Sequence, residues 1–498
     1  MHMRRHKWLP RLAAGLCAVL LLSGLPASAS VPYNSYVYDR YSRPTPAPDA
    51  YVPVGTIDGQ MLGVGAFNAP QDIFKDAAGR LYVADTGNNR IVALAADRKS
   101  AKALSTFRNG DKTETLNAPR NVFVTADGIY YIADTGNKRV LVADGDGNVL
   151  RILGKPDSDL FGANTEFKPR DLVVTSAGTV YVLVEGVYQG AVIFSPDGEF
   201  AGFYGSNKVE VSLSLLADFF WKNFMTSAQK SRMRRYVPVQ YSSIQIDSED
   251  FVYLTTEAAS SPSERVRKLN PLGQNILRSS SNDKLFFGDT GTFQLQGETY
   301  ETALTAIDVI DGKYITVLDR SRSRIFQYNQ ECDLLTVFGC SGSLEGAFTE
   351  PVGLCGVGNN VFVLDAQRNA ITVFELTPYG ETLHTAIDIY TDGRYQDSLP
   401  YWYEILKYNS LSVLANRGIG KALYQVGESE KAVEYFEKCN DTDGYSSAYG
   451  DIRKAGIRAN FYAIALGLAL LIVAGWLCKK FRVFPRLLRR IRERRKGA

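Results

Sequence analysis

Two short segments carry the polar residues that most resemble a functional loop. Residues 83–94 read VADTGNNRIVAL, and residues 132–143 read IADTGNKRVLVA. An Asp that accepts hydrogen bonds, beside Asn and Arg donors, could hold a ligand or could close a tight turn. The near repeat favours the turn, because a catalytic loop need not recur, whereas a turn-stabilising device in a repeated scaffold should.

Other catalytic chemistry finds little support. His384 is the one histidine beyond His6, so a zinc centre made of several histidines cannot be assembled. A Ser-His-Asp triad would need His384, which falls in an expected outer strand, ETLHTAI. The chain has no GxSxG elbow and no glycine-rich phosphate loop of useful length. We therefore assign no catalytic residue, and leave any metal ligands open.

The elements that position these loops recur about every 50 residues. Pro70, Pro119 and Pro169 each open a unit of short apolar strands separated by Gly- or Asp-containing turns. Six such units follow one another between residues 54 and 391. Four strands per unit at this period are typical of β-propeller blades, which must stack because one blade cannot bury both faces. The sequence predicts a mainly β, six-bladed propeller, with VGTIDG near residue 54 as the strand that closes the ring.

The loop motif, together with the Pro-strand opening, resembles the NHL-repeat family of propellers over residues 54–391. The resemblance is strong in the first two units, weaker in the fifth and sixth, and lost in the third, LVEGVYQGAV. It implies that the Asp-Asn-Arg set ties the turn between the second and third strands, with Gly87 permitting a positive φ. The expected structural positions are Asp85, Asn88, Arg90, Asp134, Asn137, Arg139, Asp319, Arg324, Asp365 and Asn369.

The two ends predict an exported, membrane-anchored chain. Residues 1–29 have a basic start, an apolar core and Ala-Ser-Ala, as in a secretory signal peptide. Residues 459–478 form a 20-residue stretch without a charge, long enough to span a bilayer, and are followed by a basic tail, 479–498. The positive-inside rule places this tail in the cytoplasm and everything before the span outside a cell membrane, as a single-pass protein.

Charge and cysteines limit the partners further. The formal net charge is +3, but the signal carries four Lys/Arg and no acid and the tail nets +9, so the exported part is near −10. This net negative charge argues against nucleic-acid binding by the exported part, because such binding requires clustered positive charge. No cysteine pair has metal-binding CxxC spacing, and a disulfide among Cys332, Cys340 and Cys355 stays open against buried thiols.

Three further segments are distinct from the blades. A Tyr- and Pro-rich stretch, 30–53, predicts an extended arm, and 209–238 predicts an amphipathic helical insertion. Residues 392–458 are helical in pattern. Within them 416–440 resembles one tetratricopeptide repeat, and the packing positions are Gly420, Gly427, Ala432 and Phe436. One repeat is too short for a typical peptide groove, so a stalk is favoured over a peptide receptor.

The sequence thus favours a membrane-anchored binding or scaffold module over an enzyme. The expected ligand is a protein or glycan on a propeller face, with an integral membrane complex as a second partner and no cofactor. The alternative is a calcium-dependent lactonase or esterase that uses oxygen ligands at the propeller axis.

Overall fold

The computed structural model describes residues 31–480, except 163, 206–239, 258–260, 279–284, 292 and 296–297. The signal segment 1–29, the insertion 209–238 and the tail beyond Lys480 therefore lie outside the described residues. Contacts divide the chain into two compact units. One comprises Met1–Val37 and Pro44–Glu381, and the other Tyr38–Arg43 and Thr382–Ala498.

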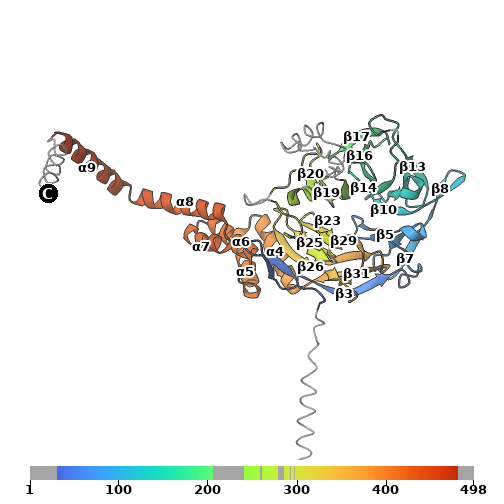
Figure 1. Cartoon of the computed structure of the whole chain (residues 1–498), viewed down its shortest axis with the longest axis horizontal. Helices are drawn as coiled ribbons and strands as arrows, with labels where there is room; N and C mark the ends of the chain where they lie inside the picture. The colour runs from blue at the N-terminus through green and yellow to red at the C-terminus, as the bar shows by residue number, and fades with distance from the viewer. Residues whose placement is uncertain are drawn as a thin grey trace, which may run out of the picture. The chain divides into compact units, whose positions relative to one another are not determined.

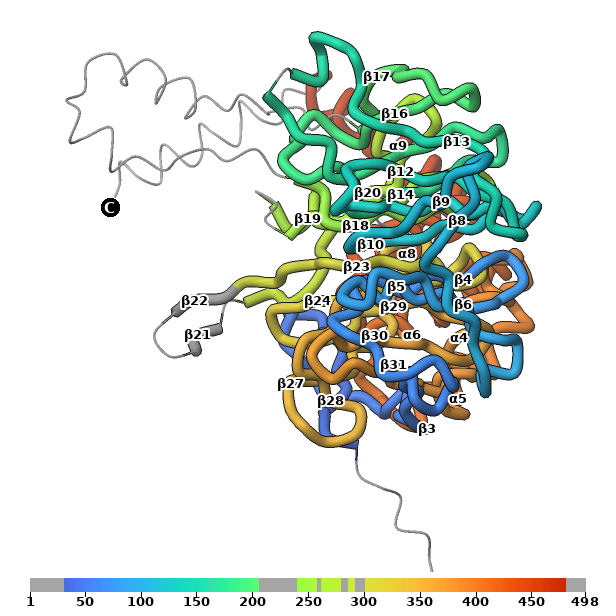
Figure 2. Tube along the Cα trace, turned by 90° about the vertical axis from the view of Figure 1, so that its right-hand side faces the viewer, coloured from blue at the N-terminus to red at the C-terminus, as the bar shows by residue number. Residues whose placement is uncertain are grey.

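The first unit is a six-bladed propeller of antiparallel sheets built from consecutive strands (Figures 1 and 2). Blade 1 consists of β4 (Asp72–Lys75), β5 (Leu81–Asp85), β6 (Arg90–Leu94) and β7 (Ala101–Leu104). Blade 2 consists of β10 (Pro119–Val124), β11 (Tyr130–Asp134), β12 (Arg139–Ala143) and β13 (Val149–Leu153). Blade 3 consists of β14 (Pro169–Val174), β15 (Val180–Val184), β16 (Ala191–Phe194) and β17 (Phe200–Tyr204).

The second half of the ring is less regular. Blade 4 has three described strands, β18 (Tyr241–Ile246), β19 (Val252–Thr256) and β20 (Val266–Leu269). Blade 5 consists of β23 (Leu304–Ile310), β24 (Tyr314–Asp319), β25 (Arg324–Tyr328) and β26 (Leu334–Phe338). Blade 6 contains β29 (Pro351–Val357), β30 (Asn360–Asp365) and β31 (Ala370–Leu376). Short two-stranded pairs lie between or beside the blades: β1 (Tyr36–Tyr38) with β2 (Pro44–Pro46), β8 (Thr106–Asn109) with β9 (Lys112–Thr115), β21 (Phe293–Leu295) with β22 (Glu298–Tyr300), and β27 (Cys340–Ser341) with β28 (Ala347–Phe348).

The ring is closed by a strand from the start of the chain. β3 (Tyr51–Asp58) pairs antiparallel with β31 as the fourth strand of blade 6, which is the role predicted for VGTIDG. Two predicted boundaries are therefore wrong. The arm ends before Tyr51 rather than at 53, and the propeller strands end at Leu376 rather than at 391. Since β3 already fills the outer position, the chain after Leu376 turns into a helix instead of a fourth strand.

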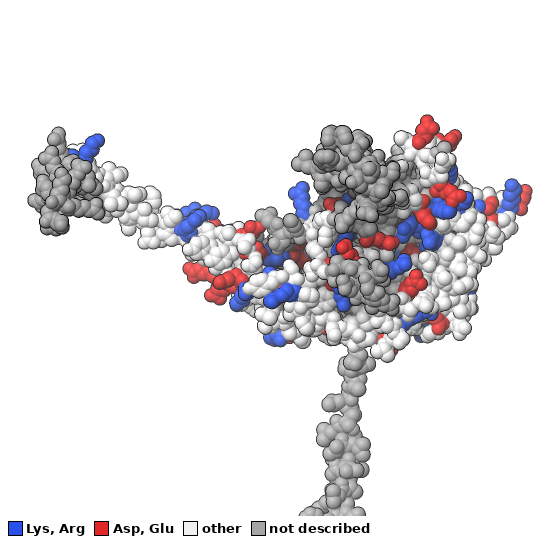
Figure 3. Space-filling model, in the orientation of Figure 1, with Lys and Arg blue, Asp and Glu red and all other residues white. Residues whose placement is uncertain are grey.

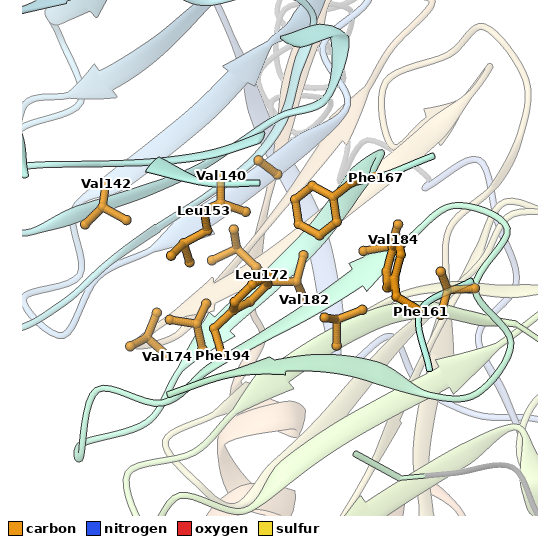
Figure 4. Packing of buried hydrophobic residues seen from close by; sticks show 14 residues of the cluster. Val140, Val142, Leu153, Phe161, Phe167, Leu172, Val174, Val182, Val184 and Phe194 are labelled. Carbon is orange, nitrogen blue, oxygen red and sulfur yellow. The ribbon is translucent and has the colours of Figure 1, made fainter. Parts of the chain in front are cut away.

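The core of the propeller lies between adjacent blades. Figure 4 shows Val140, Val142 and Leu153 of blade 2 facing Leu172, Val182 and Phe194 of blade 3. The same alternation of apolar side chains buries the other blade contacts, as the inward faces of β5, β11 and β30 show.

The second unit is helical. It contains α4 (Pro378–Thr391), α5 (Tyr395–Tyr408), α6 (Val413–Gln425), α7 (Ser429–Cys439), α8 (Thr442–Ala459) and α9 (Phe461–Lys480). Phe436 is buried, and a Cβ on Gly420 would come within 2.8 Å of its ring, so glycine lets α6 and α7 approach closely. Ala432 is also buried, and Gly427 turns the chain between the two helices with a φ of 86°.

α9 is long and apolar enough to cross a membrane, with a mean hydropathy of 2.3. None of its residues is buried by the rest of the protein, and Figure 3 shows uncharged surface along most of its length. The helix begins two residues later than the predicted span of 459–478, because Ala459 ends α8 and Asn460 separates the two helices. This is compatible with a single-pass anchor.

Candidate functional site: an axial funnel

The loop motif of blades 1 and 2 is fully hydrogen-bonded within the protein. The Asp85 carboxylate, which is completely buried, accepts from the Asn68 amide at 2.7 Å, from Asn88 Nδ2 at 2.8 Å and from Arg90 Nε at 2.7 Å. Arg90 also donates to the Val64 carbonyl. Blade 2 repeats this arrangement with Asp134, Asn137 and Arg139, where the Arg139 guanidinium also pairs with Glu114. The buried carboxylates of both loops are thus occupied by donors of the protein itself, as a turn-stabilising role requires.

The same loops also join neighbouring blades, which the sequence did not reveal. Thr86 Oγ1 donates to the Pro119 carbonyl at 2.7 Å, and Asn89 Oδ1 accepts from the Ala118 amide at 2.7 Å. The residue with a positive φ is Asn89, at 55°, and not Gly87 as predicted. Glycine is needed at 87 for another reason, since a Cβ there would lie 2.6 Å from the Asn68 carbonyl oxygen.

Blades 5 and 6 use the predicted residues differently. Asp319 accepts from the Ala303 and Ser321 amides, whereas Arg324 donates to Asp289 at 2.8 Å. The expected Asp319–Arg324 pair is therefore absent among the described contacts. Asp365 accepts four backbone amides, those of Thr349, Glu350, Gln367 and Arg368. Asn369 Oδ1 accepts from the Ala69 amide of blade 1 and so ties the last blade to the first.

Where the motif is lost, charged residues take its place at the axis. The residue after the second strand is Thr86 or Thr135 in blades 1 and 2, where its hydroxyl bonds the next blade. At the same position blades 3, 4 and 5 carry Glu185, Glu257 and Arg320, all exposed. These three side chains line a cavity at the end of the ring where the inner strands begin.

A β-bulge at the start of the inner strands turns a second set of side chains toward the same cavity. Register shifts occur at the first residues of β10, β14, β18, β23 and β29. A bulge re-aims the extra residue, which would otherwise follow the alternation of the strand. The residues at this position, with Gln71 in blade 1, all line the cavity: Gln71, Arg120, Arg170, Ser242, Thr305 and Val352.

We call this cavity the axial funnel. Its volume is about 390 Å³, within the usual range for small-molecule sites, and its lining is mostly polar. The Arg120 guanidinium lies 3.4 Å from the Glu185 carboxylate, a loose and half-exposed pair. The guanidinium groups of Arg170 and Arg320 have no hydrogen bond or ion pair among the residues that the structure describes. The funnel thus places three arginines beside two exposed glutamates, Glu185 and Glu257, and only Arg120 lies within ion-pair distance of one of these glutamates among the described residues.

The floor of the funnel is a chain of hydrogen bonds across four blades. Asn121 Nδ2 donates to Asp72 Oδ2 at 2.7 Å and to Asp171 Oδ1 at 2.8 Å. Asp171 Oδ2 accepts from Ser243 Oγ and from the Ile244 amide, both at 2.9 Å. These side chains hold the same register position in successive inner strands, so the ring symmetry brings them together. In blade 6 that position is Gly353, where a Cβ would lie 3.0 Å from Asp72 Oδ1.

Enclosure of these two carboxyl groups changes their acidity. Burial raises the pKa of Asp171 to about 6, against the opposing effect of its hydrogen bonds. Burial and then the charge of Asp171 raise the pKa of Asp72 well above its ordinary value. One neutral amide bridges the two groups, and no cation among the described residues is bonded to either. The floor therefore favours proton uptake in the mildly acidic range.

The floor does not fit the calcium site of the lactonase alternative. A calcium site needs several oxygen atoms that converge on one point. The Asn121 amide nitrogen occupies the space between the two carboxylates, and its oxygen has no partner in the described part of the chain. Among the described residues no group of three His, Cys, Asp or Glu could hold a metal ion. We derive no calcium chemistry from this arrangement.

The opposite end of the axis is a second, larger opening of about 890 Å³. A buried ion pair separates it from the floor: Lys75 Nζ lies 2.7 Å from Asp308 Oδ2, which also accepts from the Gly356 amide. Phe74 and Phe123 pack against each other beside this pair, at 4.9 Å between ring centroids. The inner strands therefore close the axis, and the funnel does not continue through the ring.

Solved structures with propeller folds resemble this chain at low identity. No protein-family model matches the chain, and no curated protein does either. A catalytically inactive virginiamycin B lyase from Staphylococcus aureus is 11% identical, with a TM-score of 0.40, over 66% of this chain and all of its own. The extracellular domain of a proposed one-component system from B. thetaiotaomicron is 11% identical, with a TM-score of 0.34, over 61% of this chain and 32% of that one. A proposed gluconolactonase is 10% identical, with a TM-score of 0.38, over 69% and 98% of the two chains. The likeness concerns the propeller fold alone.

The other predicted residues lie apart from the funnel. His384 is in α4, not in the outer strand expected from ETLHTAI. Cys332, Cys340 and Cys355 are free thiols, which answers the disulfide question for the described residues. Burial raises the pKa of Cys332 to about 12 and that of Cys355 well above its ordinary value, so these thiols are unreactive.

The raised pKa values of the floor predict an unusual dependence of stability on pH. A carboxyl whose pKa is higher in the folded protein binds protons that the unfolded chain releases, so the free energy of unfolding falls as pH rises from about 4 through 6. Asp72, Asp171 and Asp319 share this direction. We expect unfolding by urea to need less denaturant at pH 8 than at pH 5, and Asp171→Asn to reduce this difference. Equal pH slopes for the wild type and the variant would contradict the assignment to Asp171, and Asp127→Asn, exposed at the other opening, is the control.

Proposed function

We propose that the chain is a membrane-anchored, extracytoplasmic binding protein of the NHL-propeller type, whose axial funnel captures a polar group presented by a glycan or a protein. The observation that carries the proposal is that blades 3 to 5 replace the blade-joining threonine of blades 1 and 2 by Glu185, Glu257 and Arg320, which all line the funnel. Elsewhere in the ring the same loop position serves the scaffold, through Thr86 and Thr135.

The anchor gives the proposal its cellular setting. α9 would cross the cell membrane once, with the basic tail in the cytoplasm and the propeller outside. The helices α5 to α8, with the tetratricopeptide-like α6–α7 pair, would form a short stalk, and an integral membrane complex is a second candidate partner. A calcium-dependent lactonase remains the alternative, and no contact in the described floor favours it.

Photo-crosslinking in native membranes tests this proposal. A benzoylphenylalanine in place of Val352, which lines the funnel, should form an adduct with the captured glycan or protein. The same group in place of Asp127, at the opposite opening, is the matched control and should give none. Arg320→Gln should weaken the adduct at position 352. Equal adducts at both positions, or none at 352, would contradict capture in the funnel.

A further inference from the structure

The arginines of the loops between the second and third strands of blades 1 and 6 differ in their contacts from those of the funnel. Those in the loops are engaged: Arg90 bonds a carboxylate and three carbonyls, and Arg368 donates to the Gly342 and Leu344 carbonyls. In the funnel, Arg170 and Arg320 make no such contact with a described residue, and Arg120 has one loose pair. The three guanidinium groups share the wall with the carboxylates of Glu185 and Glu257, and an anion that binds beside the unpaired Arg170 and Arg320 would gain charge-assisted hydrogen bonds.

The funnel also offers acceptors that need donors from a ligand. Glu185 and Glu257 place exposed carboxylates at its wall. Thr305 Oγ1 lines the funnel and is enclosed without a hydrogen bond among the described residues. Asn121 Oδ1 is also enclosed without a partner in the described part of the chain, but Asn121 is not among the residues that line the funnel. An unsatisfied enclosed acceptor costs free energy that a donor from a ligand recovers.

These two sets of groups restrict the chemistry of the ligand. Its anionic group fits a planar carboxylate, which guanidinium groups bind with paired hydrogen bonds. A doubly charged phosphate is disfavoured, because Glu185 and Glu257 share the wall. The carboxylates of Glu185 and Glu257 and the hydroxyl of Thr305 suit hydroxyl donors. Few apolar side chains, among them Ala306 and Val352, line the funnel, so binding rests on hydrogen bonds and charge.

We propose that the axial funnel binds a hydroxylated monocarboxylate, of which a hexuronic acid, free or at the end of a saccharide chain, is the simplest example. The carboxylate contacts the unpaired guanidinium groups of Arg170 and Arg320, and the ring hydroxyls donate to Glu185, Glu257 and Thr305 on the wall. This inference rests on the proposed function, because it names the group that the funnel captures.

Isothermal titration of the full-length protein in detergent micelles tests the ligand class. Glucuronate and a glucuronate-terminated disaccharide should bind, and glucose, which lacks the carboxylate, should bind at least about tenfold more weakly. Tighter binding of the disaccharide would assign the source to a saccharide chain, and tighter binding of the monosaccharide to the free acid. Glucose binding as tightly as glucuronate would overturn the role of the carboxylate. Glutamate or inorganic phosphate binding as tightly would overturn the class.

Substitutions locate the site. Arg170→Gln and Arg320→Gln should each weaken glucuronate binding by about tenfold or more, since each removes a charge-assisted contact. Arg394→Gln, an exposed arginine paired with Asp397 on α5, is the matched control and should bind as the wild type does. Unchanged binding in both funnel variants would overturn the site. If no saccharide acid binds but the crosslinked adduct at position 352 still forms, the ligand class alone is overturned. If no saccharide acid binds and no adduct forms at position 352, the proposed function is overturned as well.

Discussion

Asp85→Ala should lower the free energy of unfolding of the propeller by about 3–5 kcal/mol, the usual cost of removing one partner of a buried ion pair. The substitution leaves the Arg90 Nε, the Asn88 amide and the Asn68 backbone amide without their shared acceptor. No second carboxylate is bonded to Arg90 among the described residues. Urea unfolding of the full-length protein in detergent, followed by far-ultraviolet circular dichroism, measures the change.

The second copy of the motif gives this experiment an internal comparison. Asp134→Ala should cost less, because Arg139 Nη1 keeps Glu114 at 2.6 Å. Asp127→Ala removes an exposed carboxylate and should change the free energy of unfolding by less than about 0.5 kcal/mol. If Asp85→Ala were as mild as Asp127→Ala, the loop would not be a structural device. Its polar residues would then again be candidates for ligand binding.

The repeated part of the fold could be predicted because the same sequence pattern occurs in several units. Pro-strand openings, turn residues and apolar strands recur at a constant period, and each copy predicts the same blade. The closing strand was also predictable, since VGTIDG is a strand without a unit of its own. Its pairing with β31 shows that the extra strand completes the last blade.

The helix after blade 6 shows where local pattern misled the prediction. The segment around His384 has the residue types of a strand, yet its buried positions, Tyr379, Leu383, Ala386 and Ile387, follow the spacing of a helix. β3 had already taken the fourth position of the blade, so this segment was not needed to complete it. Tertiary packing then decided the structure of the segment over its strand propensity.

The funnel could not be predicted from the motif search, because its residues are defined by register rather than by type. Arg120 and Arg170 follow the blade-opening Pro, and Glu185 stands where the motif had degenerated. The one usable signal is this loss of the motif in the third unit, which by itself identifies no residue that faces the axis. A β-bulge turns the residue after this Pro toward the axis. The presence of an arginine does not predict a bulge.

Closure of the ring makes the second large prediction. Tyr51→Ala, at the start of β3, should lower the free energy of unfolding by about 3–5 kcal/mol, as for other buried aromatic truncations. Tyr51 is 2% exposed and stacks on Phe338 at 4.8 Å, and its hydroxyl accepts from the buried Gln327 amide at 2.9 Å. Tyr41→Ala, whose side chain is 61% exposed, is the matched control and should have little effect on the same urea curve. Tyr51→Phe separates the two contributions, since it keeps the stacking and loses the Gln327 contact, and should fall between the wild type and Tyr51→Ala. Equal stabilities for Tyr51→Ala and Tyr41→Ala would mean that β3 contributes little to the last blade, whereas the expected loss means that β3 holds the propeller shut.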